Sequence, residues 1–236
     1  HFKDLAVVSV GVHRIHFSSS NGARLVTLTT PPVTVIPGPP AELRINRQPG
    51  GLLEGGTAFP VQPVVLVTDI GGNLCSESRV ITATLHAFPA SSTLVGNTSA
   101  PSGGSYGEPL VETSLGALTF TGLGINTAGS GYVVRFSSPG LVPADTAALT
   151  ILVGPASKLG ISTQPADVYT GVTFYTQPVV GVQDAGGNLV TAGSFEVSAA
   201  IHKHAVAPSL MSAVSLLGAT TESSINGFAT YKTLKL

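Results

Sequence analysis

The chain has 236 residues, a net charge of −1 and only 10% charged residues, against roughly 25% in an average soluble domain. It therefore lacks the basic surface that binding to nucleic acid or anionic lipid requires. The mean hydropathy is +0.39. No apolar run, however, reaches the ~18–20 residues of a membrane-spanning helix.

Strand signals follow one another at short spacing along the middle of the chain. Residues of each run alternate between two faces, turn residues separate the runs, and no helical period of useful length occurs. The expected strands cover Ala41–Ile45, Val61–Thr68, Arg79–His86, Ala117–Leu123, Gly131–Ser137 and Ala147–Val153. The predicted fold class is all-β, with two antiparallel sheets packed as an immunoglobulin-like sandwich.

The sequence repeats itself with a period of about 115 residues. The segment from Gln62 to Leu74 matches the segment from Gln177 to Leu189 at 10 of 13 positions. At the N-terminus, Phe17-Ser-Ser19 matches Phe136-Ser-Ser138. Such internal similarity is the signature of tandem repeats.

The repeat divides the chain into three parts. Residues 1–38 are the C-terminal part of one repeat, 39–154 a complete repeat, and 155–236 the N-terminal part of a third. Because both ends fall inside a repeat, we expect the polypeptide to continue in both directions. The joints, Gly38–Pro40 and Gly154–Ala156, are short and contain proline, which predicts a semi-rigid, end-to-end rod.

These motifs resemble a known family. Asp-x-x-Gly-Asn after a valine-rich strand, then Gly-Ala-Leu-Thr-Phe and Gly-x-Gly-Tyr, is similar to the immunoglobulin-like repeats of bacterial invasin- and intimin-type adhesins. The chain is also similar to immunoglobulin-like arrays in large surface proteins of protists and algae. The resemblance implies a stalk, filament or fibre outside the cell or on its surface, and it offers no catalytic residues.

Two glycine-rich segments, Asp69-Ile-Gly-Gly-Asn73 and Asp184-Ala-Gly-Gly-Asn188, superficially resemble calcium loops. They lack the many oxygen ligands that an EF-hand supplies. Hairpin turns are the favoured interpretation, with Asp69 and Asp184 capping the backbone and Gly72, Asn73, Gly187 and Asn188 accepting positive φ.

Other candidate sites are weaker. His202 and His204 share one face of an expected strand, but no third zinc ligand is evident nearby. His13 and His16 are interpreted as exposed strand residues. Cys75, the single cysteine, aligns with Val190 and is expected to be a small buried residue, with an intermolecular disulfide as the alternative.

Asn97 begins an Asn-Thr-Ser sequon and is a candidate N-glycosylation site if the source secretes glycoproteins. The Ser/Thr-rich loop Pro89–Ser105 is a candidate for O-glycans. No nucleophile elbow, phosphate loop or dinucleotide fingerprint occurs, so neither an enzyme nor a cofactor is expected.

The sequence therefore predicts a structural repeat segment of a large extracellular filament, appendage or surface protein. Its expected partners are other copies or other subunits of such an assembly. Two alternatives stay open. One is an adhesin stalk or binding module, which would use the loop Pro89–Glu112. The other is a non-catalytic accessory domain of a secreted enzyme.

Overall fold

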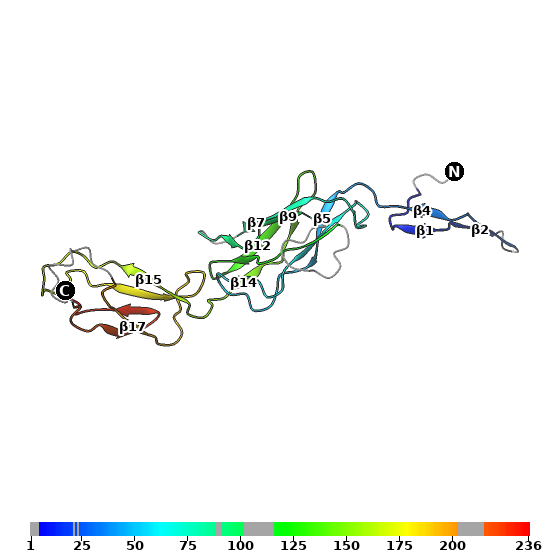
Figure 1. Ribbon diagram of the computed structural model, residues 1–236. Helices are drawn as coiled ribbons and strands as arrows, with labels where there is room; N and C mark the ends of the chain where they lie inside the picture. Colours follow the sequence, from blue (N-terminus) through cyan, green and yellow to red (C-terminus); the bar gives the residue numbers. More distant parts are fainter. Residues whose placement is uncertain (1–4, 21, 23, 88–90, 102–115, 203–214) are drawn as a thin grey trace.

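The computed structural model describes residues 5–20, 22, 24–87, 91–101, 116–202 and 215–236. Over these residues the protein is all-β, with several antiparallel sheets and no helix. A helix long and apolar enough to cross a membrane is accordingly absent from these ranges. Figure 1 shows the strands in three groups strung end to end, with the first and last groups at opposite ends of the molecule.

The first group, called the N-terminal segment, comprises residues 5–37. It contains two two-stranded sheets, β1 with β4 and β2 with β3. The strands are β1 (Gly11–His13), β2 (His16–Ser20), β3 (Leu25–Thr29) and β4 (Val33–Val35). Most of its apolar side chains are exposed, among them Leu25, Leu28 and Val33.

The second group, called the middle unit, comprises residues 41–153. One sheet has the order β10-β6-β5, and the other runs β13-β12-β7-β9 with β14 also paired to β12. Two further short strands, β8 and β11, pair with each other in a separate two-stranded sheet. The strands are β5 (Glu42–Arg47), β6 (Val64–Thr68), β7 (Val80–Ala87), β8 (Leu94–Val95), β9 (Ser99–Pro101), β10 (Ala117–Thr119), β11 (Gly124–Ile125), β12 (Gly129–Ser137), β13 (Ala144–Asp145) and β14 (Leu149–Ile151).

The third group, called the C-terminal unit, comprises residues 157–236. It has a three-stranded sheet of order β15-β16-β19 and a two-stranded sheet of β17 and β18. The strands are β15 (Lys158–Thr163), β16 (Val179–Gln183), β17 (Glu196–Ser198), β18 (Thr221–Ser223) and β19 (Phe228–Thr230).

Period-two alternation builds the core of the middle unit. In β12, Tyr132, Val134 and Phe136 are fully buried, whereas the residues between them are only half-buried. They share one core with side chains of the other sheet, including Val65, Val67 and Leu118. The rings of Phe120 and Phe136 lie 4.9 Å apart. The apolar alternation read from the sequence is therefore what holds the two sheets together.

The expected strands lie where predicted, but some boundaries were wrong. The run Ala117–Leu123 breaks after Thr119, because Gly122 takes a φ of +69° and the chain turns into β11. The run Val61–Thr68 begins only at Val64, since Pro63 has no N–H for the ladder. Val61 instead bridges to Gly50. The run Ala147–Val153 contracts to β14.

A glutamine fixes the same loop crossing in both units. Gln62 donates from Nε2 to the carbonyls of Phe59 (2.8 Å) and Leu123 (3.0 Å), and its Oε1 accepts from Leu123 N at 3.0 Å. In the C-terminal unit Gln177 makes the matching bonds, donating to Phe174 O and Leu234 O and accepting from Leu234 N. The two units therefore share construction as well as sequence.

Replacing Gln62 by Leu keeps most of the volume but removes the side-chain partner of Phe59 O and of Leu123 N, while Leu123 O still accepts from Phe59 N. We expect a loss of ~1–3 kcal/mol of folding free energy, which corresponds to a Tm lower by about 5–15 °C in differential scanning calorimetry. The matched control is Gln48→Leu, because Gln48 is exposed and makes one long hydrogen bond of 3.3 Å. Equal Tm values for the two variants would contradict this role of Gln62.

Candidate functional site: the joints between the units

The predicted turn at Asp69–Asn73 follows β6 and closes on itself. Asp69 N donates to Asn73 O at 2.9 Å, and Gly72 N donates to Asp69 O at 3.0 Å. Gly72 has a φ of +80°, a conformation that glycine adopts without strain. The corresponding bonds and the positive φ recur at Asp184 and Gly187.

The carboxylate of Asp69 is 4% exposed and surrounded by N–H donors. Oδ1 accepts from Gly71 N (2.9 Å) and Asn73 N (2.8 Å), and Oδ2 accepts from Gly38 N at 2.8 Å. The side-chain amide of Asn73 also donates to both oxygens, at 3.1 and 3.0 Å. N–H groups donate to both oxygens of this carboxylate. The ionised side chain therefore caps the turn rather than serving as a calcium ligand.

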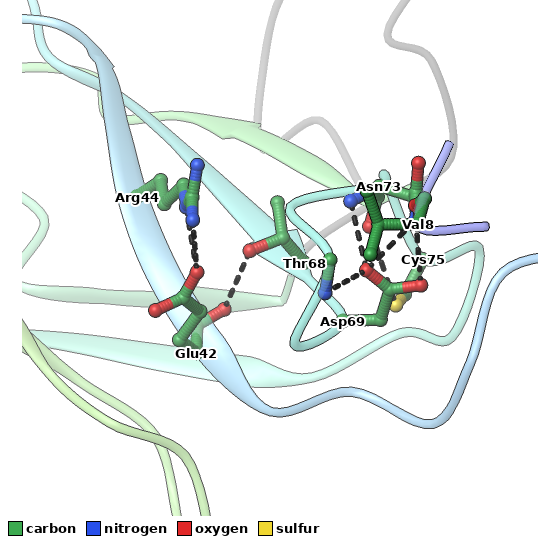
Figure 2. A network of polar contacts seen from close by, with 8 residues as sticks. Val8, Glu42, Arg44, Thr68, Asp69, Asn73 and Cys75 are labelled. Carbon is green, nitrogen blue, oxygen red and sulfur yellow. Dashed lines mark hydrogen bonds and ion pairs between the residues drawn. The ribbon is translucent and has the colours of Figure 1, made fainter. Parts of the chain in front are cut away.

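Asn73 connects the turn to the preceding group of strands. Its Nδ2 donates to Val8 O at 2.6 Å, and its Oδ1 accepts from Val10 N at 3.1 Å. Figure 2 shows Asp69, Asn73 and Val8 converging at this point. The amide thus pairs with the backbone of the N-terminal segment as a neighbouring strand would.

The joint between the middle and C-terminal units has the same bonds. Asn188 donates from Nδ2 to Asn126 O at 2.8 Å, and its Oδ1 accepts from Ala128 N at 2.8 Å. The carboxylate of Asp184, fully buried, accepts from Gly154 N (2.9 Å) and Asn188 N (2.8 Å). Each bond has a counterpart in the first joint, and the partner residues are related by the internal repeat. The joint is therefore a repeated element of the fold.

The first glycine of each turn is required by space rather than by backbone conformation. Gly71 and Gly186 are not among the residues with positive φ. A Cβ at Gly71 would lie 2.7 Å from Val8 O, and one at Gly186 would collide with Asn126 O. A side chain here would push the two units apart, which explains why both turns carry Gly-Gly.

The second joint includes a further contact between the two units. Gly186 N donates to Gly55 O at 3.2 Å, and a Cβ at Gly55 would collide with Nδ2 of Asn188. Ile70, the counterpart of Ala185, is 93% exposed.

Cys75 lies next to the linker of the first joint. It is buried and free, and its thiol donates to Gly38 O at 3.6 Å. Burial raises the pKa of the Cys75 thiol, and the negative charges of Asp69 and Glu77 raise it further. Val190, its counterpart, is also buried. The thiol therefore serves as a small apolar side chain in this position.

Among the described residues, the other candidate side chains do not come together in a common site. His13 is half-buried and its Nε2 lies 2.8 Å from Ser9 O, while the exposed His16 contacts Thr29 Oγ1 at 2.9 Å. His202 is exposed, and His204 lies outside the described residues. Asn97 is exposed and donates to Thr121 Oγ1 at 3.1 Å.

The loops that were expected to carry glycans or a binding function are described only at residues 91–101. In the described ranges, no group of three or more His, Cys, Asp or Glu side chains is placed to hold a metal ion.

The positive φ predicted at Gly72 and Gly187 is present, but the positive φ predicted at Asn73 and Asn188 was wrong. The sequence analysis also missed that these asparagines bond across the joints. The available signal was the second glycine. A hairpin turn needs one residue with positive φ here, whereas both turns have two glycines.

No protein-family model and no curated protein matches the chain. Two solved structures are similar to it, both of surface layer protein SbsC. Domains 1–6 match at 15% identity with a TM-score of 0.32, over 93% of this chain and 26% of that one. Domains 4–9 match at 14% identity with a TM-score of 0.30, over 90% and 30%.

This chain therefore spans less than a third of either solved structure. Neither is an invasin- or intimin-type adhesin, so that resemblance stays a prediction. Likeness at this level leaves the function to be argued from the chain's own joints.

Replacing Asn188 by Ala removes both cross-joint hydrogen bonds and leaves the carbonyl of Asn126 and the N–H of Ala128 without partners. We expect a loss of ~1–3 kcal/mol at the joint. In ¹⁵N relaxation, the C-terminal unit should then tumble with a shorter correlation time than the middle unit. The control Asn46→Ala, at an exposed residue of β5, should leave the two correlation times equal. Equal times in both variants would show that the amide does not fix the units.

Donors around Asp69 lower its pKa from 3.8 to about 2, with the Asn73 side-chain amide as the largest cause and Gly38 N–H the next. A lowered pKa means that the carboxylate stabilises the joint fully above pH 3.8 and that this contribution is lost as pH falls through about 2.

A ¹³C NMR titration of the carboxyl carbons, with the Asp69→Asn variant to assign the resonance, should give a midpoint near 2 for Asp69. A midpoint at the ordinary 3.8 would mean that the cap does not form.

Proposed function

We propose that this chain is a structural, non-catalytic segment of a large extracellular filament, appendage or surface protein. In this proposal the middle unit is one complete immunoglobulin-like β-sandwich. The predicted boundaries 1–38, 39–154 and 155–236 mark successive repeats of about 115 residues. The observation that carries the proposal is the joint, which the chain builds twice from equivalent residues.

A specific joint favours a mechanical role over a linker role. A free linker leaves backbone groups to water, whereas here the linker glycines Gly38 and Gly154 donate to buried carboxylates. The asparagine amides then donate to backbone carbonyls of the preceding group of strands, at Val8 and Asn126. Domains held at both the linker and the adjoining loop keep a defined orientation, which suits an extended rod.

The scarcity of charge supports packing in an assembly. With 10% charged residues, the chain has little electrostatic repulsion to keep neighbouring copies apart. The ion pairs of the described residues are local, such as Arg135 with Asp145 at 2.7 Å on neighbouring strands. Other copies or other subunits of the same assembly are therefore the proposed partners.

The joint at the far end of the C-terminal unit must differ in detail. Thr170 stands where the middle unit has Gly55, whose missing Cβ makes room for Asn188. A further repeat docked there would have to lie slightly displaced from the arrangement of the second joint. The proposed rod is thus a series of related joints rather than a strictly uniform one.

Location can be tested with antibodies raised against the 236-residue chain. On intact, unpermeabilised cells of the source, immunogold labelling should follow extended fibres or cover the surface. Label that concentrates at the tips of thin stalks would favour the adhesin function instead. Label that requires permeabilisation would overturn the extracellular proposal.

We also propose Asn97 as an N-glycan acceptor when the chain is secreted through a glycosylating pathway. The side chain is exposed next to the tight turn at Gly96, which has a φ of +81°. Secretion from a eukaryotic host should give a mass increase that an N-glycosidase removes and that Asn97→Gln abolishes. Thr121→Ala, which removes only the hydrogen-bond partner, should retain the glycan. An unshifted mass for the secreted wild-type chain would contradict the proposal.

A further inference from the structure

The second joint closes on three consecutive residues of the middle unit, 126–128, which we call the receiving loop. Asn188 donates to Asn126 O and accepts from Ala128 N, both at 2.8 Å. Thr127 lies between these two contacts. One asparagine amide can make both bonds only when the Asn126 carbonyl and the Ala128 N–H point toward it at the same time. The conformation of the receiving loop therefore decides whether the joint closes.

A buried tyrosine holds the centre of the receiving loop. Tyr132 of β12 is completely buried, and its hydroxyl donates to Thr127 O at 2.8 Å. Oγ of Ser92, which is also buried, lies 3.0 Å from the same hydroxyl. Because the tyrosine has one proton to donate and gives it to Thr127 O, Ser92 is the donor in the second contact. The Tyr132 hydroxyl thus connects the receiving loop to the core of the middle unit.

The first joint contains the same contact with a different side chain. Asn73 donates to Val8 O and accepts from Val10 N, and these two residues flank Ser9. The carbonyl oxygen of Ser9 lies 2.8 Å from Nε2 of His13. In both joints, a ring side chain therefore contacts the middle carbonyl of the segment that the asparagine binds.

His13 and Tyr132 occupy the same place in the strand pairing. His13 lies opposite Val33 in the pairing of β1 with β4, and Tyr132 lies opposite Leu149 in the pairing of β12 with β14. A register shift between Ser130 and Tyr132 accounts for the one additional residue in the middle unit. The two rings differ in chemistry, yet each keeps a polar atom on the equivalent carbonyl. The polar contact is therefore the feature that the two joints share.

We propose that Tyr132 is a positioning residue of the second joint. Its hydroxyl holds the Thr127 carbonyl and so sets the receiving loop in the conformation that Asn188 binds. A loop that is already held loses little conformational freedom when the C-terminal unit docks, which strengthens the joint beyond its own hydrogen bonds. The inference rests on the proposed function, because it concerns the joint that makes the chain a rod.

The test removes the hydroxyl and leaves the ring in place. Tyr132→Phe keeps the core filled but takes away the donor to Thr127 O. In ¹⁵N relaxation of the full chain, the wild type should give equal correlation times for the middle and C-terminal units. In Tyr132→Phe the C-terminal unit should have the shorter correlation time, because the receiving loop leaves the conformation that Asn188 binds.

Two control variants separate this role from a general loss of stability. Tyr231→Phe removes an equally buried hydroxyl, which donates to Val197 O at 2.6 Å within the C-terminal unit. Ser92→Ala removes a buried hydroxyl of the same network but leaves the bond from Tyr132 to Thr127 O. Both should lower the Tm, since each loses a buried hydrogen bond. Both should keep the two correlation times equal. Calorimetry on the same samples verifies that every variant is folded at the temperature of the relaxation measurement.

Equal correlation times in Tyr132→Phe would overturn the inference, because the hydroxyl would then serve the core alone. Unequal times in Ser92→Ala would overturn it too, since any loss of a buried hydroxyl would then loosen the joint. Either result leaves the rod proposal standing as long as the wild type gives equal times. Unequal times in the wild type would instead contradict the rod itself.

Discussion

A buried carboxylate must be surrounded by hydrogen-bond donors, and at Asp69 and Asp184 this requirement organises the contact between units. The donors are the glycine N–H of the linker, the turn backbone and one asparagine amide. Satisfying the carboxylate therefore fixes the linker and orients the asparagine in the same step. The asparagine amide has a second N–H and a carbonyl oxygen that the carboxylate does not use, and these bond to the backbone of the preceding unit.

This arrangement leaves the side chains at some positions of the joint free to vary and constrains those at others. The asparagines bind backbone atoms, so the partner side chains differ freely, as Val8 and Asn126 do. The glycines facing those backbones cannot gain a side chain without forcing the units apart. In the C-terminal unit Thr170 stands in place of Gly55, so the chain departs from this constraint there.

The sheets were predictable from sequence because they depend on local signals. Alternating apolar residues and glycine- or proline-rich turns located the strands of the middle unit. The break after Thr119 was not predictable, because it depends on a positive φ at Gly122. The function of Asn73 and Asn188 was missed for a different reason. A turn asparagine looks the same whether its amide faces water or a neighbouring unit, and only the second glycine distinguishes the two.

The central claim is that these joints give neighbouring units one fixed orientation. Residual dipolar couplings measured for the middle and C-terminal units in a single weakly aligned sample test it most directly. A fixed joint predicts that one alignment tensor, of one magnitude, fits the couplings from β5–β14 and from β15–β19. Two tensors of different orientation or magnitude, with smaller couplings in the C-terminal unit, would show that the units reorient independently and would contradict the account.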